Sequence, residues 1–228
     1  MSVKYSFIIP TKNEENYIKD CITSIKNLNV DKKFVEIIIV DSHSQDDTVR
    51  VAKETYNLRI LYEKTKGPSA ARNKGAKAAN GEFLIFTDAD VRFEKNFLEN
   101  LDKIKGGCVF SLSFWDASLL DNIIFSSWNV FVRMMLKLKI PLTNGSCFAF
   151  KRSTFEEING FQDSLLTNED HDIARKSFKI TAFEFCPTGV KTSIRRIRQK
   201  GPSNFLYQHF LNTKEYFLHG KSNHSYWD

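Results

Sequence analysis

The stretch Phe83-Leu84-Ile85-Phe86-Thr87-Asp88-Ala89-Asp90 decides the fold. Its four apolar residues are followed, after Thr87, by the two aspartates of an Asp-x-Asp pair. Four consecutive apolar residues bounded by polar ones predict a short buried strand. Two carboxylates two residues apart are hard oxygen ligands of the kind that Mg²⁺ and Mn²⁺ favour. An Asp-x-Asp pair also occurs in ordinary solvated loops. Its position here favours a ligand site, because ligands bind beyond the carboxyl ends of parallel strands.

Upstream of this stretch, short β-branched runs alternate with runs of helical spacing. The predicted strands are residues 3–9, 34–40, 58–62 and 83–86, and the predicted helices are residues 14–28, 46–56 and 69–79. Such alternation predicts an α/β fold with a mainly parallel central sheet flanked by helices. Polar clusters follow three of the strands, at residues 10–14, 41–44 and 88–90. We therefore expect these clusters to share one rim of the sheet and to form one site.

Downstream of residue 90 the pattern is less regular. The predicted strands are residues 109–114, 147–150 and 180–185, and the predicted helices are residues 119–138, 172–178 and 203–218. The sequence contains no internal repeat, low-complexity tract or linker. Residues 1–228 are therefore expected to form a single continuous domain.

The composition limits the class of protein. With 42% hydrophobic residues and 20 phenylalanines in 228 residues, wholesale disorder is excluded. The net charge of +6 suits an anionic ligand, nucleic acid or an anionic membrane surface, and selects none of them. The four cysteines form no CxxC pair, so we expect reduced thiols in a cytoplasmic protein. The sequence begins with no signal-peptide pattern, and no stretch reaches the roughly 18 apolar residues of a membrane span.

Several short motifs occur in the order and spacing of inverting family-2 glycosyltransferases of the GT-A fold. In the first half they are Ile9-Pro10-Thr11-Lys12-Asn13-Glu14-Glu15, Ile39-Val40-Asp41-Ser42-His43-Ser44, Ala71-Arg72-Asn73-Lys74-Gly75-Ala76, Ala79-Asn80-Gly81-Glu82 and Thr87-Asp88-Ala89-Asp90. Later, Asn144-Gly145-Ser146 and Gly160-Phe161-Gln162 precede Glu169-Asp170. Each motif is weak alone, but together they are specific. The chain resembles this family over roughly residues 3 to 200.

The resemblance implies a nucleotide-binding half at residues 1–90, an acceptor-binding half at 91–200 and a C-terminal amphipathic helical tail at 201–228. Asp41 would accept a hydrogen bond from the nucleobase, and Asp90 with Asp88 would bind Mn²⁺ or Mg²⁺. The residues implied around the nucleotide sugar are Pro10, Thr11, Asn13, Glu14, Asp41, Ser44, Arg72, Asp88 and Ala89. From the residues alone, an equally good interpretation of Glu14 is an acid that stabilises the first turn of a helix. Arg72 is equally an ordinary cation on a helix surface.

Glu169-Asp170 is the second chemical centre that the resemblance implies. Inverting transfer needs a base to remove the proton of the attacking acceptor. The family has an aspartate here, so Asp170 is predicted to be that base and Glu169 to orient or contact the acceptor. Asn144 and Gly145 are predicted to contact the acceptor as well. The alternative is that the two acids cap the following helix. If the acceptor is an ionised phosphate, Asp170 would mainly position it.

The basic segment 195–203 resembles an Arg-x-x-Gly-x-Ser segment of polyprenyl-phosphate sugar transferases, which Arg198, Gly201 and Ser203 match. Arg198 and Ser203 are therefore predicted to bind phosphate on a mobile loop that closes over the donor. A solvated basic turn is the alternative.

Two features bear on the metal ion. In some lipid-phosphate mannosyl enzymes a glutamine two places after the Asp-x-Asp motif helps to hold the metal, and this chain has Arg92 there. His209 and His219 are candidates for an additional metal ligand, although a histidine on a helix surface is commoner.

The sequence thus predicts a glycosyltransferase that moves a sugar from a UDP- or GDP-sugar to an acceptor, either a sugar hydroxyl or a polyprenyl phosphate. A nucleotidyltransferase and a non-catalytic nucleotide-sugar binding module are the alternatives. Nucleic acid is the weakest partner, because the basic residues are scattered. The aromatic, basic segments 119–140 and 203–227 fit peripheral contact with the inner face of the membrane. They also fit packing against the sheet or a homodimer contact.

Overall fold

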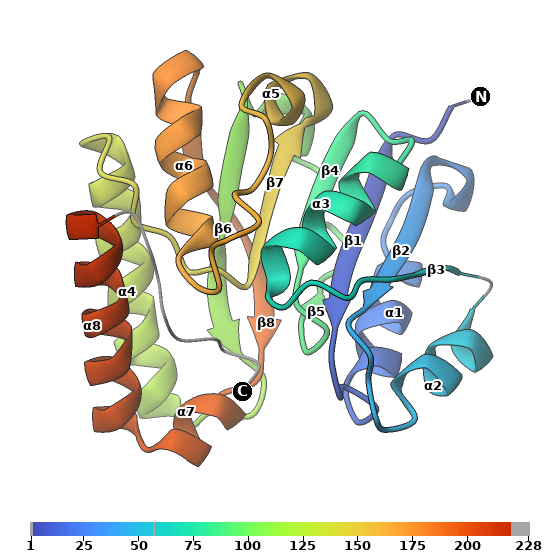
Figure 1. Cartoon of the computed structure of the whole chain (residues 1–228), viewed down its shortest axis with the longest axis horizontal. Helices are drawn as coiled ribbons and strands as arrows, with labels where there is room; N and C mark the ends of the chain where they lie inside the picture. Colours follow the sequence, from blue (N-terminus) through green and yellow to red (C-terminus); the bar gives the residue numbers. More distant parts are fainter. Residues whose placement is uncertain (1, 57, 220–228) are drawn as a thin grey trace.

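The computed structural model describes residues 2–56 and 58–219, which fold around a central sheet (Figure 1). The strands are β1 (Tyr5–Thr11), β2 (Val35–Asp41), β3 (Arg59–Tyr62), β4 (Phe83–Thr87), β5 (Arg92–Phe93), β6 (Gly107–Phe114), β7 (Cys147–Lys151) and β8 (Phe183–Thr192). The helices are α1 (Ile18–Lys26), α2 (Thr48–Thr55), α3 (Pro68–Ala78), α4 (Leu119–Lys137), α5 (Arg152–Glu157), α6 (Glu169–Ile180), α7 (Arg195–Lys200) and α8 (Pro202–His219). Two short 3-10 helices lie at Lys32–Phe34 and Leu101–Lys103.

The sheet has eight strands in the order β3-β2-β1-β4-β7-β6-β8-β5. The first four strands in the chain, β1 to β4, are parallel to one another, as their alternation with helices predicts. β7 runs antiparallel to both β4 and β6, β8 runs parallel to β6, and β5 runs antiparallel to β8. The predicted α/β class is confirmed, and the sheet is parallel in its first half and mixed in its second.

Strand β1 shows how the sheet is buried on both faces. Phe7 and Ile9 enter one hydrophobic cluster with α1, while Ile8 enters the opposite cluster with α3. All three side chains are fully buried. A strand covered on both faces reads as a continuous apolar run, which explains why residues 5–9 lack the alternation of a half-exposed strand.

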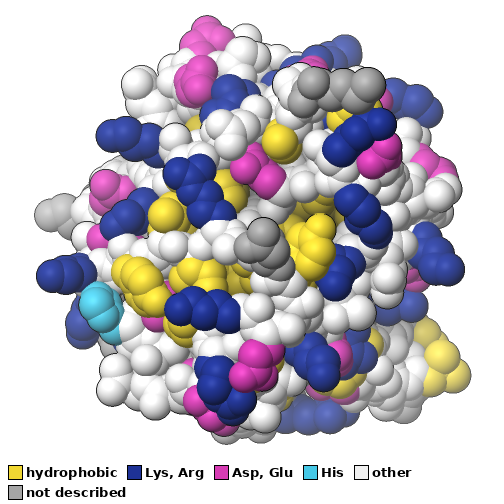
Figure 2. Space-filling view, turned by 90° about the vertical axis from the view of Figure 1, so that its right-hand side faces the viewer, with side chains coloured by type: hydrophobic (Ala, Val, Ile, Leu, Met, Phe, Trp, Pro, Cys, Tyr) yellow, Lys and Arg dark blue, Asp and Glu magenta, His cyan; other side chains and the backbone are white. Residues whose placement is uncertain are grey.

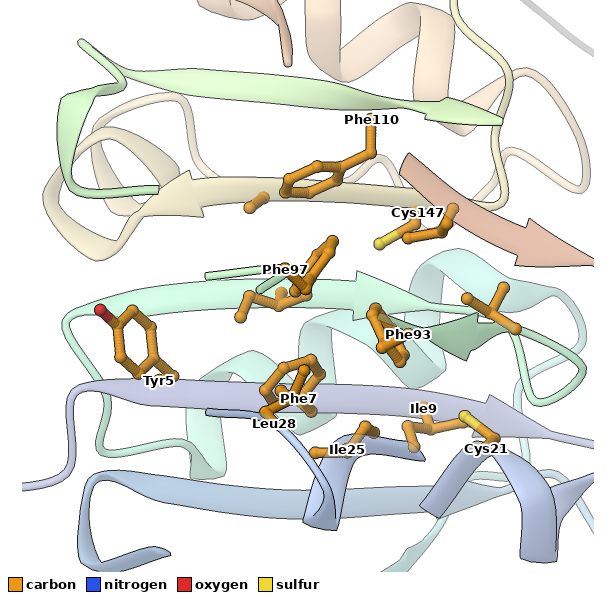
Figure 3. Close-up of a cluster of buried hydrophobic side chains, with 14 of the residues drawn as sticks. Tyr5, Phe7, Ile9, Cys21, Ile25, Leu28, Phe93, Phe97, Phe110 and Cys147 are labelled. Atoms are coloured by element: carbon orange, nitrogen blue, oxygen red, sulfur yellow. The ribbon is translucent and has the colours of Figure 1, made fainter. Parts of the chain in front are cut away.

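Aromatic contacts account for the abundance of phenylalanine. In the cluster of Figure 3, the rings of Phe93 and Phe97 lie 4.6 Å apart and those of Phe97 and Phe110 lie 4.5 Å apart. Phe7 contacts Phe93 edge-on at 5.3 Å. These contacts connect β1, β5 and β6, so the first and second halves of the chain share one core. Tilted and edge-on ring pairs add to the stability gained from burial alone.

The second half differs from the sequence prediction at several boundaries. Helix α6 begins at Glu169 rather than at residue 172, because Asn168 takes a left-handed φ of 61° and starts the helix there. Helix α6 also continues to Ile180, so the predicted strand at 180–185 is wrong at its start and β8 runs from Phe183 to Thr192. Residues 195–200, predicted as part of a mobile loop, form α7. Strand β5 and helix α5 were not predicted, because they are too short to show a periodic pattern.

Helix α8 is fastened to the start of α6. Asn168 donates from Nδ2 to the backbone oxygen of Asn212 at 3.1 Å and accepts from Thr213 Oγ1 at 3.3 Å. The Tyr216 hydroxyl donates to Asp172 Oδ1 at 2.9 Å. The described part of the tail therefore supports the segment that carries the predicted base. Residues 220–228, with His224 and Trp227, lie outside the described residues.

Two surface properties follow from the described residues. None of the helices within 2–56 and 58–219 combines the length and the apolar character that crossing a bilayer requires.

On the face over α2 and β3, Lys and Arg side chains are interspersed with Asp and Glu rather than gathered into one basic patch (Figure 2). Because the charges on that face are mixed, it is not a continuous basic surface of the kind that binds a polyanion.

Candidate active site

The carboxyl ends of β1 and β2 carry the first group of predicted residues. Thr11 and Asp41 are paired in register, and Thr11 Oγ1 donates to Asp41 Oδ1 at 3.2 Å. Ser44 donates to the same carboxylate from its hydroxyl at 2.5 Å and from its backbone N–H at 3.0 Å. Asn13 joins the two loops, because its N–H donates to Ser44 Oγ at 3.0 Å. Asp41 is thus held in one orientation, and Pro10 lies buried in β1, paired with Val40, one position before Thr11 and Asp41.

Arg72 is the centre of the second group. Its side chain is 2% exposed, so the interpretation of Arg72 as a surface cation is wrong. Nη2 donates to Asp88 Oδ1 at 3.2 Å, and Nη1 donates to Glu169 Oε1. The guanidinium also lies over the ring of Phe148 at 5.1 Å. Arg72 therefore links the Asp-x-Asp motif on β4 to the acidic pair at the start of α6.

Burial controls the ionisation of this group. Burial raises the pKa of Asp88 to about 6, although Arg72 pulls it down. The pKa of Glu169 is also raised by burial against the pull of Arg72. Burial lowers the pKa of Arg72, but Glu169 and Asp88 outweigh that effect and the net shift is upward. Arg72 is therefore charged, and any further cation that reaches Asp88 favours its carboxylate form.

Asp170 lies in a third group, next to the predicted acceptor loop. Thr143 Oγ1 donates to Asp170 Oδ2, and His171 Nδ1 lies 3.1 Å from Asp170 Oδ1. Burial lowers the pKa of His171, but the Asp170 carboxylate outweighs burial and the net shift is upward. Gly145 has a φ of 70°, and a Cβ there would lie 3.2 Å from Asp170 Oδ2. The backbone thus passes directly over the carboxylate, which a larger residue would crowd.

The loop of Asn144, Gly145 and Ser146, which is predicted to contact the acceptor and is called the acceptor loop below, is joined to the Asp-x-Asp motif. The N–H of Asp88 donates to the backbone oxygen of Ser146 at 3.1 Å. Asn144 is held by its Nδ2, which donates to the backbone oxygen of Phe110 at 2.7 Å. Its Oδ1 is buried and has no hydrogen-bond partner within the described part of the chain. A buried oxygen without a partner is a place where a bound ligand is expected to donate a hydrogen bond.

Asp90 and Glu14 form a fourth group with two arginines that the sequence analysis did not select. Arg195 Nε donates to Asp90 Oδ2 at 3.2 Å, and Arg195 Nη2 donates to Glu14 Oε2 at 2.5 Å. Arg196 Nη2 lies 3.4 Å from Glu14 Oε1. Thr192 Oγ1 donates to the other Asp90 oxygen at 3.0 Å. Burial raises the pKa of Glu14 against the pull of both arginines.

Some predicted residues lie elsewhere. The Ala89 side chain packs into the hydrophobic cluster of β1 and α1, so only its backbone can contact a ligand. Arg198 is turned away from the acids and donates to the backbone oxygen of Asp116 at 2.7 Å. Arg92, at the position that departs from the mannosyl enzymes, lies over the Trp115 ring at 3.9 Å. Ser203, His209 and His219 lie on α8, and their side chains are not among those that the structure describes.

The four groups meet on one rim. Glu14 follows β1 and is joined through Arg195 to Asp90, and Asp88 is joined through Arg72 to Glu169, the neighbour of Asp170. Asp41 lies beside Thr11 at the end of the adjacent strand. The acids that the sequence selected therefore converge rather than face separate surfaces. Arg195 and Arg196 lie in the basic segment 195–203, from which the sequence analysis selected only Arg198 and Ser203. The spacing of residues in that segment does not indicate that its first two arginines face the site.

Asp88 and Asp90 are the residues that would hold a divalent ion. The described residues hold no group of three or more acids, histidines or cysteines placed for a metal. The pair nevertheless fits an ion that takes its other ligands from a diphosphate and water. Asp88 is 23% exposed, and its Oδ2 makes no hydrogen bond to the described residues. Each oxygen of Asp90 already accepts one hydrogen bond, from Thr192 and from Arg195, so an ion there would compete with the Arg195 guanidinium for the carboxylate.

Comparison with known proteins gives the following matches. The model of "Glycosyl transferase family 2" matches residues 6–158. The dolichyl N-acetyl-alpha-D-glucosaminyl phosphate 3-beta-D-2,3-diacetamido-2,3-dideoxy-beta-D-glucuronosyltransferase of Methanococcus voltae is 29% identical over an alignment of 202 residues, which covers 79% of this chain and 59% of that protein. An uncharacterized glycosyltransferase of Rickettsia felis is 30% identical over an alignment of 168 residues, which covers 68% of this chain and 28% of that protein.

Solved structures share the fold. The mannosyltransferase PcManGT from Pyrobaculum calidifontis, in complex with GDP-Man and Mn²⁺, has a TM-score of 0.71 at 24% identity, covering 92% of this chain and 63% of that chain. S. aureus TarS 1-349 in complex with UDP-GlcNAc has a TM-score of 0.63 at 20% identity, covering 81% of this chain and 56% of that chain. The chain thus spans less than two thirds of these relatives.

Proposed function

Because the chain belongs to glycosyl transferase family 2, we propose that it transfers a sugar from a nucleoside-diphosphate sugar to an acceptor hydroxyl or lipid phosphate. The observation that carries the proposal is the bridge of Arg72 between Asp88 and Glu169. It joins the acid expected beside the donor diphosphate to the acids expected beside the acceptor. A donor and an acceptor held on either side of this bridge are adjacent, as a direct displacement requires.

The donor would lie over residues 1–90, at the ends of β1, β2 and β4. Thr11, Asn13, Asp41 and Ser44 would line the nucleoside pocket, where the fixed Asp41 carboxylate accepts from the base. The nucleotide of the donor could be UDP or GDP, because structures of the same fold were solved with UDP-GlcNAc and with GDP-Man. A divalent ion held by Asp88 and Asp90, Mn²⁺ or Mg²⁺, would supply positive charge to the departing diphosphate.

The acceptor would lie over residues 91–200. Asp170, oriented by Thr143 and His171, would accept the proton of an acceptor hydroxyl as it attacks the anomeric carbon. Attack from the face opposite the diphosphate inverts that centre. Asn144 would accept a hydrogen bond from the acceptor substrate through its unpartnered Oδ1. An acceptor phosphate would need positioning more than deprotonation.

A donor screen tests the proposal. Calorimetry with UDP- and GDP-sugars in the presence of Mn²⁺ is expected to show binding of at least one of them. Turnover of that donor should then be lost in Asp170→Asn while its binding is retained. A nucleotidyltransferase would instead release pyrophosphate from a nucleoside triphosphate, and a binding module would show no turnover in either form. Absence of nucleotide-sugar binding with the ion present would refute the proposal.

We further propose that helix α4 contacts an anionic membrane surface and so brings a lipid-linked acceptor to the site. Six of its apolar side chains are exposed, namely Leu119, Ile123, Ile124, Val130, Phe131 and Met134, and so is Leu138, which directly follows the helix. Arg133 and Lys137 on the same helix are exposed and suit lipid phosphates. An apolar helical face with flanking cations is typical of interfacial binding. A dimer through α4 is the competing explanation, and vesicle binding distinguishes the two.

A further inference from the structure

Arg195 joins two acids that come from different loops of the rim. Its Nη2 donates to Glu14 Oε2 at 2.5 Å and its Nε donates to Asp90 Oδ2 at 3.2 Å. The two carboxylates are 8% and 5% exposed. Buried like charges repel each other strongly unless a cation lies between them. The guanidinium therefore supplies at Asp90 the positive charge that an ion would supply there.

The backbone of Arg195 is anchored while its guanidinium can be reached from solvent. The Asp116 carboxylate accepts from Ser193 Oγ at 2.6 Å and from the N–H of Ile194 at 2.8 Å, which fixes the start of α7. The Tyr17 ring lies 4.0 Å from the guanidinium carbon. The Arg195 side chain is 18% exposed, more than either of its partners. A side chain on a fixed backbone can change its contacts without unfolding the rim.

Arg195 makes its two bonds through different nitrogens. Nη2 donates to Glu14 Oε2, and Nε donates to Asp90 Oδ2, which belongs to one of the two residues that would hold an ion. A divalent ion on Asp90 would put two cations on one carboxylate, and like charges at such distances repel. The Nε contact with Asp90 is therefore the one expected to break, while the Nη2 contact with Glu14 keeps the guanidinium at the rim.

We propose that Arg195 is the internal counter-cation of the donor site, which neutralises Asp90 before the donor binds and then moves from Asp90 to the donor diphosphate. The identity of the donor rests on the proposed function. Arg196 lies next to it, 3.4 Å from Glu14 Oε1 and 33% exposed, and is placed to bind a second phosphate oxygen. Arginine forks match phosphate oxygens in geometry and charge.

The test is the affinity of the full chain for Mn²⁺ alone, without nucleotide, measured by electron paramagnetic resonance. Arg195→Met removes the competing charge and is expected to bind Mn²⁺ about tenfold more tightly than the unaltered chain. Lys200→Met is the matched control, because it removes an exposed charge of the same helix, and it should leave the affinity unchanged. Asp90→Asn in the Arg195→Met background should remove the gain. An equal affinity in Arg195→Met and the unaltered chain would overturn the inference.

A second measurement uses the unaltered chain, in case Arg195→Met does not fold. The ¹⁵Nε resonance of Arg195, assigned from its loss in Arg195→Lys, should shift when Mg²⁺ and UDP are added together. An unchanged resonance at saturation would also overturn the inference. Failure of the proposed function is seen separately, as absence of nucleotide-sugar binding by the unaltered chain, whereas the Mn²⁺ comparison needs no nucleotide and decides the role of Arg195 by itself.

Discussion

Replacement of Arg72 by methionine tests the bridge on which the site depends. Met retains an unbranched apolar stem but leaves Asp88 and Glu169 without their shared cation. Removing one partner of a buried ion pair typically costs about 3–5 kcal/mol, because the remaining charge is buried and uncompensated. Since Asp88 is 23% exposed, water can compensate it in part, and we expect the lower end, about 3 kcal/mol at pH 8.

The loss should depend on pH in a defined direction. The folded-state pKa values of Asp88, about 6, and of Glu169 are already raised by burial, so both carboxyls bind protons more readily in the folded chain. Groups of this kind stabilise the fold below their unfolded pKa, and that contribution is lost as pH rises through the folded pKa. Without Arg72 both folded pKa values rise further. The destabilisation by Arg72→Met should therefore be smaller at pH 5 than at pH 8.

Urea unfolding followed by circular dichroism at both pH values measures the effect. Arg50→Met is the control, because Arg50 is 59% exposed and solvent screens its ion pairs with Asp47 and Glu54. Adding Glu169→Gln to Arg72→Met should recover part of the loss at pH 8, because it removes one of the buried charges. A loss of under about 1 kcal/mol at pH 8, or the same loss at both pH values, would refute the bridge as described.

Further predictions address turnover, packing, membrane contact and donor binding. Asp170→Asn should lower turnover by about 10²–10⁴-fold, with donor affinity by calorimetry unchanged; a small effect would mean that another group takes the proton. Gly145→Ala would place a side chain at a φ of 70° and crowd the Asp170 carboxylate. It should lower the free energy of unfolding in urea by about 1–2 kcal/mol and reduce turnover. Turnover equal to that of the unaltered chain would argue against a role of this loop in binding the acceptor. Ile124→Glu should weaken co-sedimentation with anionic vesicles while Ile180→Glu, exposed on α6, should not; equal binding by both would exclude α4. Calorimetry should show that UDP and Mn²⁺ each raise the affinity for the other, and independent binding would disprove the shared site.

The first half of the fold followed from sequence because its strands are continuous apolar runs joined by amphipathic helices. β1, β2, β3 and β4 were each predicted to within two residues. The second half was harder, because its boundaries depend on single residues in tertiary contacts. The start of α6 is set by the left-handed Asn168, which is held by Asn212 and Thr213 of a helix more than 40 residues away. No local pattern reports such a contact.

The acids of the site were predictable and their cations were not. Asp41, Asp88, Asp90 and Asp170 stand at strand or helix ends, where topology alone brings them to one rim. The partners of these acids are decided by side-chain packing over long separations. Arg195 reaches Glu14 across 181 positions. Sequence favoured Arg198 in the same segment because of its match to a motif, and the helical geometry of α7 turns that residue toward Asp116 instead.

The charge balance of the rim explains why donor and ion are expected to bind together. Four acids of the rim are ion-paired with three guanidinium groups, the acids being Glu14, Asp88, Asp90 and Glu169 and the arginines Arg72, Arg195 and Arg196. A diphosphate alone would add negative charge to a rim whose cations are already paired with acids. A divalent ion alone would compete with Arg195 for Asp90 without giving that guanidinium a new partner. When both arrive, the ion neutralises the carboxylates and the diphosphate accepts Arg195, so each ligand removes the cost of binding the other. The same arginine that stabilises the unliganded acids then stabilises the leaving group, because negative charge develops on the diphosphate as its bond to the sugar breaks.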